Sequence, residues 1–229
     1  MEYPIRINKY LAHQGIASRR EADRLIEAGL VHINRKVAKL GDVVEERDHV
    51  VVSKKVARRE RTYLAYHKPK GVITNKDNAG KTESVLDRLA REHGIEGVFP
   101  IGRLDKDSTG LIILTNDGRL TGHLLDPERA VEKEYQVTVN KDLAPSFKEK
   151  MERGVDIEGY TTKPATVHLR GARTFTIILT EGKKHQIRRM CMNLGYTVVS
   201  LKRVRVANIM LGELKPGAVR ELSASEIGL

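Results

Sequence analysis

The chain has 229 residues, which is enough for one large domain with an appendage or for two ordinary domains. It carries 41 Lys and Arg against 30 Asp and Glu, a formal net charge of +11, so the expected partner is an extended polyanion, with nucleic acid ahead of an anionic membrane surface. The single cysteine, Cys191, excludes an internal disulfide framework, and the Cys and His spacings predict no structural metal. The sequence has neither an apolar stretch of about 20 residues nor the apolar core of a signal peptide, which predicts a soluble, cytoplasmic protein.

Two short helices are predicted at the N-terminus. The apolar residues of the first recur at helical spacing from Ile7, and Gly15 is expected to end it. The second begins at Ser18, an N-cap residue that Glu21 complements three positions later in the capping-box pattern, and Gly29 is expected to end it. Short alternating and valine-rich segments follow, so the N-terminal module is predicted to be two small helices on a little sheet.

Basic side chains are dense in this module. Arg19 and Arg20 fall in the first turn of the second helix, where the helix dipole disfavours cations unless an external anion such as phosphate binds there. Two solvated arginines on an exposed turn are the alternative interpretation. The other basic residues nearby favour phosphate binding. We therefore predict phosphate contacts for six residues of the module: Arg6, Lys9, Arg19, Arg20, Arg35 and Lys36.

Residues 53–62 carry five basic residues, one acidic residue and no periodic apolar face, so we interpret them as a linker, with phosphate contact as a second interpretation. From there on, segments rich in β-branched and aromatic residues are interrupted by helical patches at 83–91, 147–153 and 184–194. Neither a repeated βα unit nor a glycine-rich phosphate fingerprint is present. The pattern predicts an α+β domain over residues 63–229, with a mainly antiparallel or mixed sheet and flanking helices.

Two opposite charges come just before an apolar run. Arg103 and Asp105 alternate with Leu104, so they are expected to share one face of an extended segment. The run LIIL at residues 111–114 does not alternate, which favours a strand buried on both faces. The charges form either a local ion pair at the rim of the sheet or part of a reactive site. The position of Asp105, where strand gives way to loop, favours the reactive site. Asp107 is interpreted as a turn former, so the paired carboxylates of a glycoside hydrolase are not expected.

A second basic cluster lies in EGKKHQIRRMCMNLGY, residues 181–196. Apolar residues at i, i+3, i+4 and i+7 predict a packed helix in which Cys191 is a core residue. A polyanion or a buried carboxylate would stabilise this density of positive charge, and His185 is expected to contact phosphate or backbone rather than a metal. The groups that can carry positive charge here are Lys183, Lys184, His185, Arg188 and Arg189.

A tyrosine stands near the start of KEYQV, residues 133–137. Tyr135 and Val137 alternate as in a strand with one buried face. The ring of Tyr135 is therefore either part of the core or a stacking surface for a nucleic-acid base.

These segments resemble known families. Residues 5–52, and in them the SRREAD turn with its glycine spacing, resemble the S4 RNA-binding domain. Residues 67–75, 99–118, 133–137 and 181–196 resemble, in order, the motifs of pseudouridine synthases. Together they resemble the RsuA type, the ribosomal-RNA branch, nearest to its large-subunit members. Two positions depart from the pattern: His67 replaces an asparagine that commonly precedes Lys-Pro, and His185 stands where the type often has Arg or Asn.

The resemblance implies isomerisation of a specific uridine in ribosomal RNA, most of all large-subunit RNA, to pseudouridine without a cofactor or a metal. It implies that Asp105 is the catalytic carboxylate, that Arg188 pairs with it, that Tyr135 lies against the uracil and that Arg103 assists extrusion of the uridine. Ile187 is expected to line the substrate pocket. The chain would act as a monomer on ribosomal RNA or on an assembly intermediate. Further RNA contacts are expected from Lys68, Lys183, Lys184 and Arg189.

The alternative is a non-catalytic RNA-binding or ribosome-assembly factor with the same fold, because basic charge and an S4-like module account for RNA binding by themselves.

Overall fold

A computed structural model describes residues 3–53, 60–76 and 80–228. The chain forms two compact units, one of Met1–Tyr63 with Thr115–His123 and one of Leu64–Leu114 with Leu124–Leu229. Residues 54–59, most of the predicted linker, lie outside the described residues. The first unit includes a segment from the middle of the chain that the expected boundaries place in the α+β domain.

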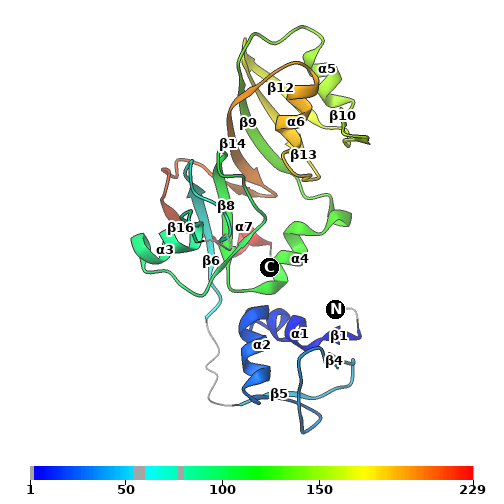
Figure 1. The fold of residues 1–229 in the computed structure, drawn as a ribbon, viewed down its shortest axis with the longest axis vertical. Helices are drawn as coiled ribbons and strands as arrows, with labels where there is room; N and C mark the ends of the chain where they lie inside the picture. The colour runs from blue at the N-terminus through cyan, green and yellow to red at the C-terminus, as the bar shows by residue number, and fades with distance from the viewer. Residues whose placement is uncertain (1–2, 54–59, 77–79, 229) are drawn as a thin grey trace. The chain divides into compact units, whose positions relative to one another are not determined.

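The first unit contains the predicted pair of helices on short strands (Figure 1). Ser18 caps the second helix, because its Oγ accepts the backbone N–H of Glu21 at 3.3 Å. Ile7, Leu11 and Ile26 form part of the small core beneath the helices. The elements are β1 (Ile5–Arg6), α1 (Ile7–His13), α2 (Arg19–Glu27), β2 (Val31–Ile33), β3 (Lys36–Val37), β4 (Val43–Val44) and β5 (Val50–Val52). The strands pair in two small sheets, β1 with β4 and β3-β2-β5, so the predicted module is confirmed.

A buried carboxylate organises the middle segment of this unit. The side chain of Asp117 is fully buried, forms an ion pair with Arg119 and accepts a hydrogen bond from the hydroxyl of Tyr63 at 2.7 Å. Burial by itself raises the pKa of Asp117, but the hydrogen bonds from Arg119 and Tyr63 outweigh it and lower the pKa to about 2. Asp117 also accepts the backbone N–H of Arg119, which explains why helix α4 (Gly118–Leu125), absent from the sequence prediction, begins here.

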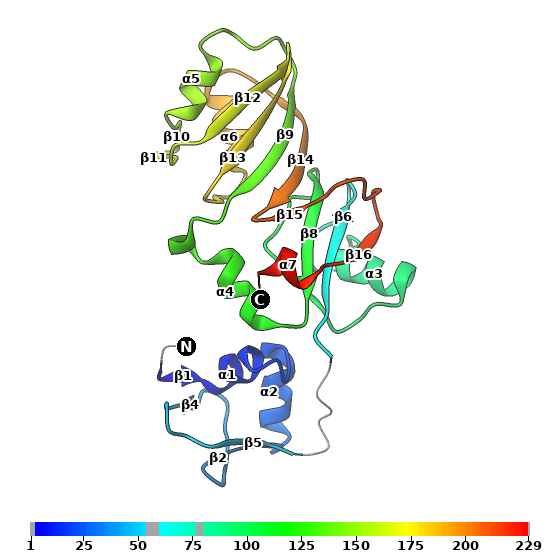
Figure 2. The same ribbon diagram turned by 180° about the vertical axis from the view of Figure 1, so that it is seen from behind.

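The second unit is built on a large mixed sheet with the strand order β12-β13-β9-β14-β8-β6-β16 (Figure 2). Strands β14 and β8 run parallel, whereas the pairs β12–β13, β13–β9, β9–β14 and β6–β16 are antiparallel. This confirms the predicted α+β class. The strands are β6 (Tyr63–Lys68), β7 (Phe99–Ile101), β8 (Thr109–Thr115), β9 (Lys133–Val139), β10 (Asp156–Ile157), β11 (Tyr160–Thr161), β12 (Thr166–Gly171), β13 (Thr174–Leu179), β14 (Val198–Val206), β15 (Ile209–Met210) and β16 (Val219–Glu221).

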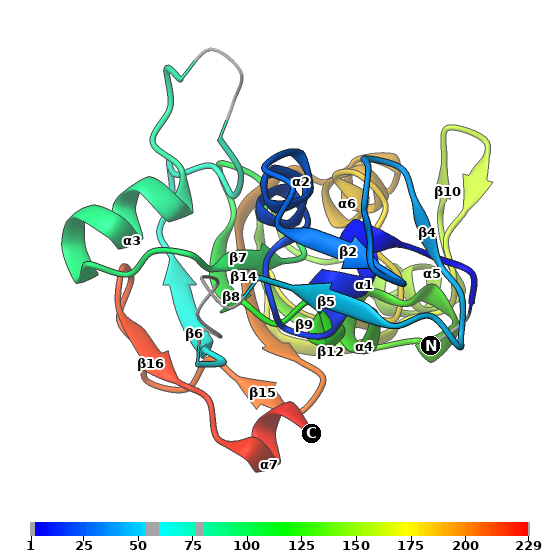
Figure 3. The same cartoon turned by 90° about the horizontal axis from the view of Figure 1, so that it is seen from below.

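Helices cover the sheet in two places. Helices α5 (Phe147–Glu152) and α6 (Gln186–Asn193) pack on one face of β12, β13, β9 and β14, and their core includes Phe147, Phe175 and Met190. Helix α3 (Val85–His93) lies beside β6 and packs on β6 and β8 (Figure 3). These three helices confirm the predicted patches, with ends shifted by up to two residues. The short helices η1 (Pro127–Arg129) and α7 (Ala224–Ile227) complete the described elements.

The apolar run of β8 occupies the centre of the sheet. Residues 111–114 are buried, as predicted for a strand covered on both faces. Next to them, Gly110 has a φ of 109°, and a Cβ there would lie 2.2 Å from the backbone oxygen of Arg203 on β14. Only glycine permits this close approach of the two parallel strands. None of the described helices is long and apolar enough to cross a membrane.

Candidate active site

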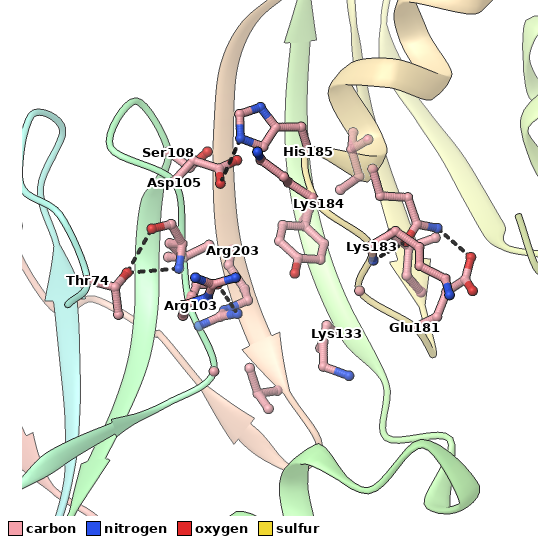
Figure 4. Close-up of a pocket in the computed structure, with 18 of the residues that line it drawn as sticks. Thr74, Arg103, Asp105, Ser108, Lys133, Glu181, Lys183, Lys184, His185 and Arg203 are labelled. Atoms are coloured by element: carbon pink, nitrogen blue, oxygen red, sulfur yellow. Dashed lines mark hydrogen bonds and ion pairs between the residues drawn. The ribbon is translucent and has the colours of Figure 1, made fainter. Parts of the chain in front are cut away.

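A pocket of about 1030 Å³ opens in the second unit (Figure 4). Its walls come from the loop between β7 and β8, from β9, from the loop before α6 and from β14. The acidic side chains that line it are Asp105, Asp126 and Glu181. The basic ones outnumber them, so the pocket attracts anions. They are Lys76, Arg103, Lys106, Lys133, Lys163, Lys183, Lys184 and Arg203.

The loop that carries Asp105 is fixed by hydrogen bonds to its backbone. Thr74 Oγ1 donates to the Leu104 carbonyl at 2.7 Å and accepts the Leu104 N–H at 3.0 Å. The N–H of Ser108 donates to the carbonyl of Asp105 at 3.0 Å and closes the turn behind it. Leu104 is buried between the half-buried Asp105 and the exposed Arg103, as the predicted alternation requires. The carboxylate of Asp105 therefore stands in the pocket on a rigid support.

A buried lysine also holds this loop in place. Lys68 is fully buried, and its Nζ donates to the carbonyls of Pro69 at 2.9 Å and Lys106 at 3.3 Å. Burial lowers the pKa of Lys68 to about 8, although the charges of Asp105 and Asp107 act in the opposite direction. The prediction that Lys68 contacts RNA is wrong, because its side chain has no exposed surface, does not line the pocket and already donates to these two carbonyls.

A histidine side chain lies beside Asp105. Nε2 of His185 lies 3.6 Å from Oδ1 of Asp105, and the two side chains are 48% and 39% exposed (Figure 4). His185 occupies the N-cap of α6 in the left-handed backbone region, with a φ of 54°.

The expected direct pairing of Arg188 with Asp105 is not seen. The guanidinium of Arg188 donates instead to Ser108 Oγ at 3.2 Å and to the carbonyl of Asp107 at 3.4 Å. Arg188 thus holds the turn that follows Asp105, while His185, one turn earlier, faces the carboxylate itself.

Tyr135 and Ile187 both line this pocket. Tyr135 lies on β9 directly opposite Arg203 of β14, and Ile187 is a buried residue of α6. Arg203 was not among the predicted site residues. It is 3% exposed, and its Nε donates to the carbonyl of Leu111 at 2.8 Å. Arg203 is two residues from the buried Leu201 on the same strand, so the two side chains lie on one face. A basic residue on the apolar face of a strand was the sequence signal that could have revealed it.

Apart from Lys68, the predicted RNA-contact residues divide into three groups. Lys183 and Lys184 are exposed at the pocket, and Nζ of Lys183 lies 4.3 Å from the ring centroid of Tyr160. Arg189 is partly exposed and forms an ion pair with Glu158, in the turn between β10 and β11. In the first unit, the side chain of Arg20 lies outside the described residues; the exposed ones are Arg6, Lys9, Arg19, Arg35 and Lys36.

Two family models match this chain. The family model for RNA pseudouridylate synthases matches residues 62–193, and that for the S4 domain matches residues 5–50. The dual-specificity RNA pseudouridine synthase RluF of Escherichia coli strain K12 is 40% identical over 227 residues, which cover 97% of this chain and 77% of the relative. The chain belongs to the RNA pseudouridine synthase family.

One further relative and one solved structure support this family assignment. Ribosomal large subunit pseudouridine synthase B of Bacillus subtilis strain 168 is 37% identical over 230 residues, covering 97% of this chain and 93% of the relative. A crystal structure of a pseudouridylate synthase superposes with a TM-score of 0.71 at 28% identity and covers 98% of both chains. The synthase match contains Asp105, Tyr135 and His185 but ends before β14, which carries Arg203.

Proposed function

We propose that this synthase isomerises a uridine of large-subunit ribosomal RNA to pseudouridine, with Asp105 as the catalytic carboxylate acting on a uridine flipped out of its stack. The observation that carries the proposal is a carboxylate on a fixed loop, in a cationic pocket that Tyr135 also lines. Ribosomal RNA as the substrate rests on the name of the Bacillus subtilis relative.

The chemistry needs one ionised carboxylate and no external reactant. The N1–C1′ bond of uridine breaks, the uracil turns, C5 bonds to C1′, and the proton of C5 is replaced by one on N1, so the product is an isomer. Asp105 either attacks C1′ or removes the C2′ proton, and both roles require the charged form. Nε2 of His185 lies 3.6 Å from this carboxylate, and the buried Lys68 holds the loop that carries it.

Water must be excluded while the glycosidic bond is open, because hydrolysis would leave an abasic site. Asp105 is 39% exposed in the protein alone, so the ribose and base of the RNA have to complete its cover. Tyr135 supplies a ring face for the uracil, and Arg103 fills the space that the flipped base leaves. Extruding a base costs a few kcal/mol, about what stacking and phosphate contacts return.

We assign RNA binding to the module of residues 5–52 and catalysis to residues 63–229, joined by the linker 53–62. The exposed basic residues of the module would grip phosphates, and Lys183 and Lys184 would hold the backbone next to the target. We further propose that the enzyme acts as a cytoplasmic monomer on ribosomal RNA or on an assembly intermediate.

The test uses ribosomal RNA transcripts labelled with tritium at C5 of uracil. The protein should release the label, and Asp105→Asn should abolish release while RNA affinity stays close to that of the wild type. Asp107→Asn is the matched control, because Asp107 is exposed in the turn and should keep its activity. Mapping pseudouridines in ribosomal RNA from cells with and without the gene identifies the target. A protein that binds every fragment but releases no label would be a binding or assembly factor instead.

A further inference from the structure

The side chain of Arg203 is held from several sides at the inner wall of the pocket. Its strand β14 lies between β9 and β8, and Gly110 of β8 touches its backbone. Its Nε donates to the Leu111 carbonyl at 2.8 Å, and its Nη1 donates to the carbonyl of Arg103 at 3.4 Å. Arg203 therefore connects the central strand to the loop that carries the catalytic carboxylate (Figure 4).

One nitrogen of this guanidinium has no partner. Nη2 of Arg203 is buried and makes no hydrogen bond to any described residue, and no described carboxylate forms an ion pair with Arg203. A buried charged donor left without an acceptor costs stability, and natural proteins retain such groups where function requires them. The side chain is 3% exposed and lines the pocket, so a molecule in the pocket is the available acceptor.

A second cation stands close by without a carboxylate partner among the described residues. Lys133 also lines the pocket, and its Nζ donates to the carbonyl of Val131 at 2.9 Å. Burial lowers the pKa of Lys133, and the neighbouring charge of Arg203 lowers it further. This wall of the pocket therefore carries uncompensated positive charge that a substrate with electron-rich oxygens would neutralise.

The register of the sheet identifies the part of the substrate that reaches this wall. Arg203 and Tyr135 are direct cross-strand partners, so their side chains leave the sheet on the same face. Lys183 and Lys184, before α6, are exposed and lie within reach of the RNA backbone phosphates. Arg203 is only 3% exposed and lies beside Tyr135, the proposed stacking ring, so we expect it to face the base.

We propose that Nη2 of Arg203 donates a hydrogen bond to a carbonyl oxygen of the flipped uracil and stabilises the negative charge that this oxygen takes up when the N1–C1′ bond breaks. The inference rests on the proposed function. The electron pair of the broken bond passes to N1 and is shared with O2 and O4, and it returns to carbon when C5 bonds to C1′. A fixed cation at one of these oxygens lowers the barrier, as a preorganised donor does for other anionic intermediates.

The test separates contact with the base from support of the loop, because Arg203 does both. A short RNA hairpin is synthesised around the uridine mapped as above, with uridine, 2-thiouridine or 4-thiouridine at the target. Single-turnover rates are measured by nucleoside chromatography for the wild type and for Arg203→Met. Sulfur is a weak hydrogen-bond acceptor, so replacing the contacted oxygen should slow the wild type about ten-fold.

On the uridine hairpin, Arg203→Met should react about 100-fold more slowly than the wild type. On the thio hairpin that slows the wild type, the variant should react at nearly the same rate as it does on uridine. Arg203→Lys keeps the charge but lacks Nη2, so its rate should also be nearly the same on the uridine and thio hairpins. It replaces Arg203→Met in the test if the methionine variant does not fold. Arg205→Met is the matched control on the same strand, because Arg205 pairs with Glu132 and Glu134 and does not line the pocket. It should keep the full thio effect.

Equal thio effects in the wild type and in the Arg203 variants at both positions would overturn the contact and leave Arg203 a structural residue. Wild-type rates that are the same on all three hairpins would overturn it as well, whatever the variants do. A wild type that converts none of the hairpins contradicts the proposed function instead, so the two failures are distinguishable.

Discussion

The imidazole of His185 lies 3.6 Å from the carboxylate of Asp105, at the place where the family resemblance puts the guanidinium of Arg188. Arg188 reaches the turn behind Asp105 instead, through Ser108 and Asp107. The support of the carboxylate is therefore divided. An exposed histidine lies next to it, and an arginine and a buried lysine fix the backbone on which it stands.

A negative charge at position 185 should impair catalysis. His185→Glu places a second negative charge against Asp105 and should lower the single-turnover rate at saturating enzyme about ten-fold, whereas His185→Arg should keep it within about five-fold of the wild type. Tritium release from labelled RNA measures the rate.

Lys184→Glu is the control for that experiment. It adds the same charge one residue away and should weaken RNA binding with a smaller effect on the saturated rate, because among the described residues His185, and not Lys184, pairs with Asp105. If His185→Glu reacted as fast as the wild type at saturation, the contact between His185 and Asp105 would have no part in catalysis.

Gly110→Ala should destabilise the second unit by about 3 kcal/mol, because the new methyl group meets the backbone of Arg203 at a φ that alanine rarely adopts. Urea unfolding measures the loss. Gly122→Ala in α4 is the matched control: a Cβ there meets nothing within 4 Å, and the change should stay within about 1 kcal/mol of the wild type or stabilise the helix. Equal stability of the two variants would mean that β8 and β14 do not approach as closely as described.

Lys68 should make stability depend on pH. Burial lowers its pKa from 10.5 to about 8, so between pH 8 and 10.5 the unfolded chain binds the proton that the folded chain has released. The free energy of unfolding of the wild type should therefore rise with pH in this window relative to Lys68→Met, by up to about 3 kcal/mol. Urea titrations at pH 7.5 and 10 measure the difference between the two proteins. A constant difference would show that Lys68 titrates as an exposed lysine does.

The exposed arginines of the first unit should control the salt dependence of RNA binding. Arg19→Ala combined with Arg35→Ala should weaken binding and lower the slope of log K against log salt by about one per lost phosphate contact. Arg173→Ala in the second unit removes an exposed arginine that pairs with Asp142, and it should leave the slope unchanged. An unchanged slope in the double variant would identify Arg19 and Arg35 as solvated surface residues.

Sequence reasoning succeeded where the signal was local. The capping residue Ser18, the buried run at 111–114 and the apolar stripe of α6 follow from spacing along a few turns or one strand, and the structure has all three. The four ordered motifs and the S4-like module likewise identified the family from contiguous residues.

The partners of the charged groups were decided by tertiary structure. Whether Lys68 meets solvent or the turn after Asp105, and whether His185 or Arg188 faces the carboxylate, depends on how strands and loops distant in the sequence are brought together. Arg203 is the clearest case, since its place beside Tyr135 exists only because β14 pairs with both β9 and β8. Local periodicity encodes which face of an element is apolar, whereas the energy of a buried charge depends on the acceptors that folding places around it.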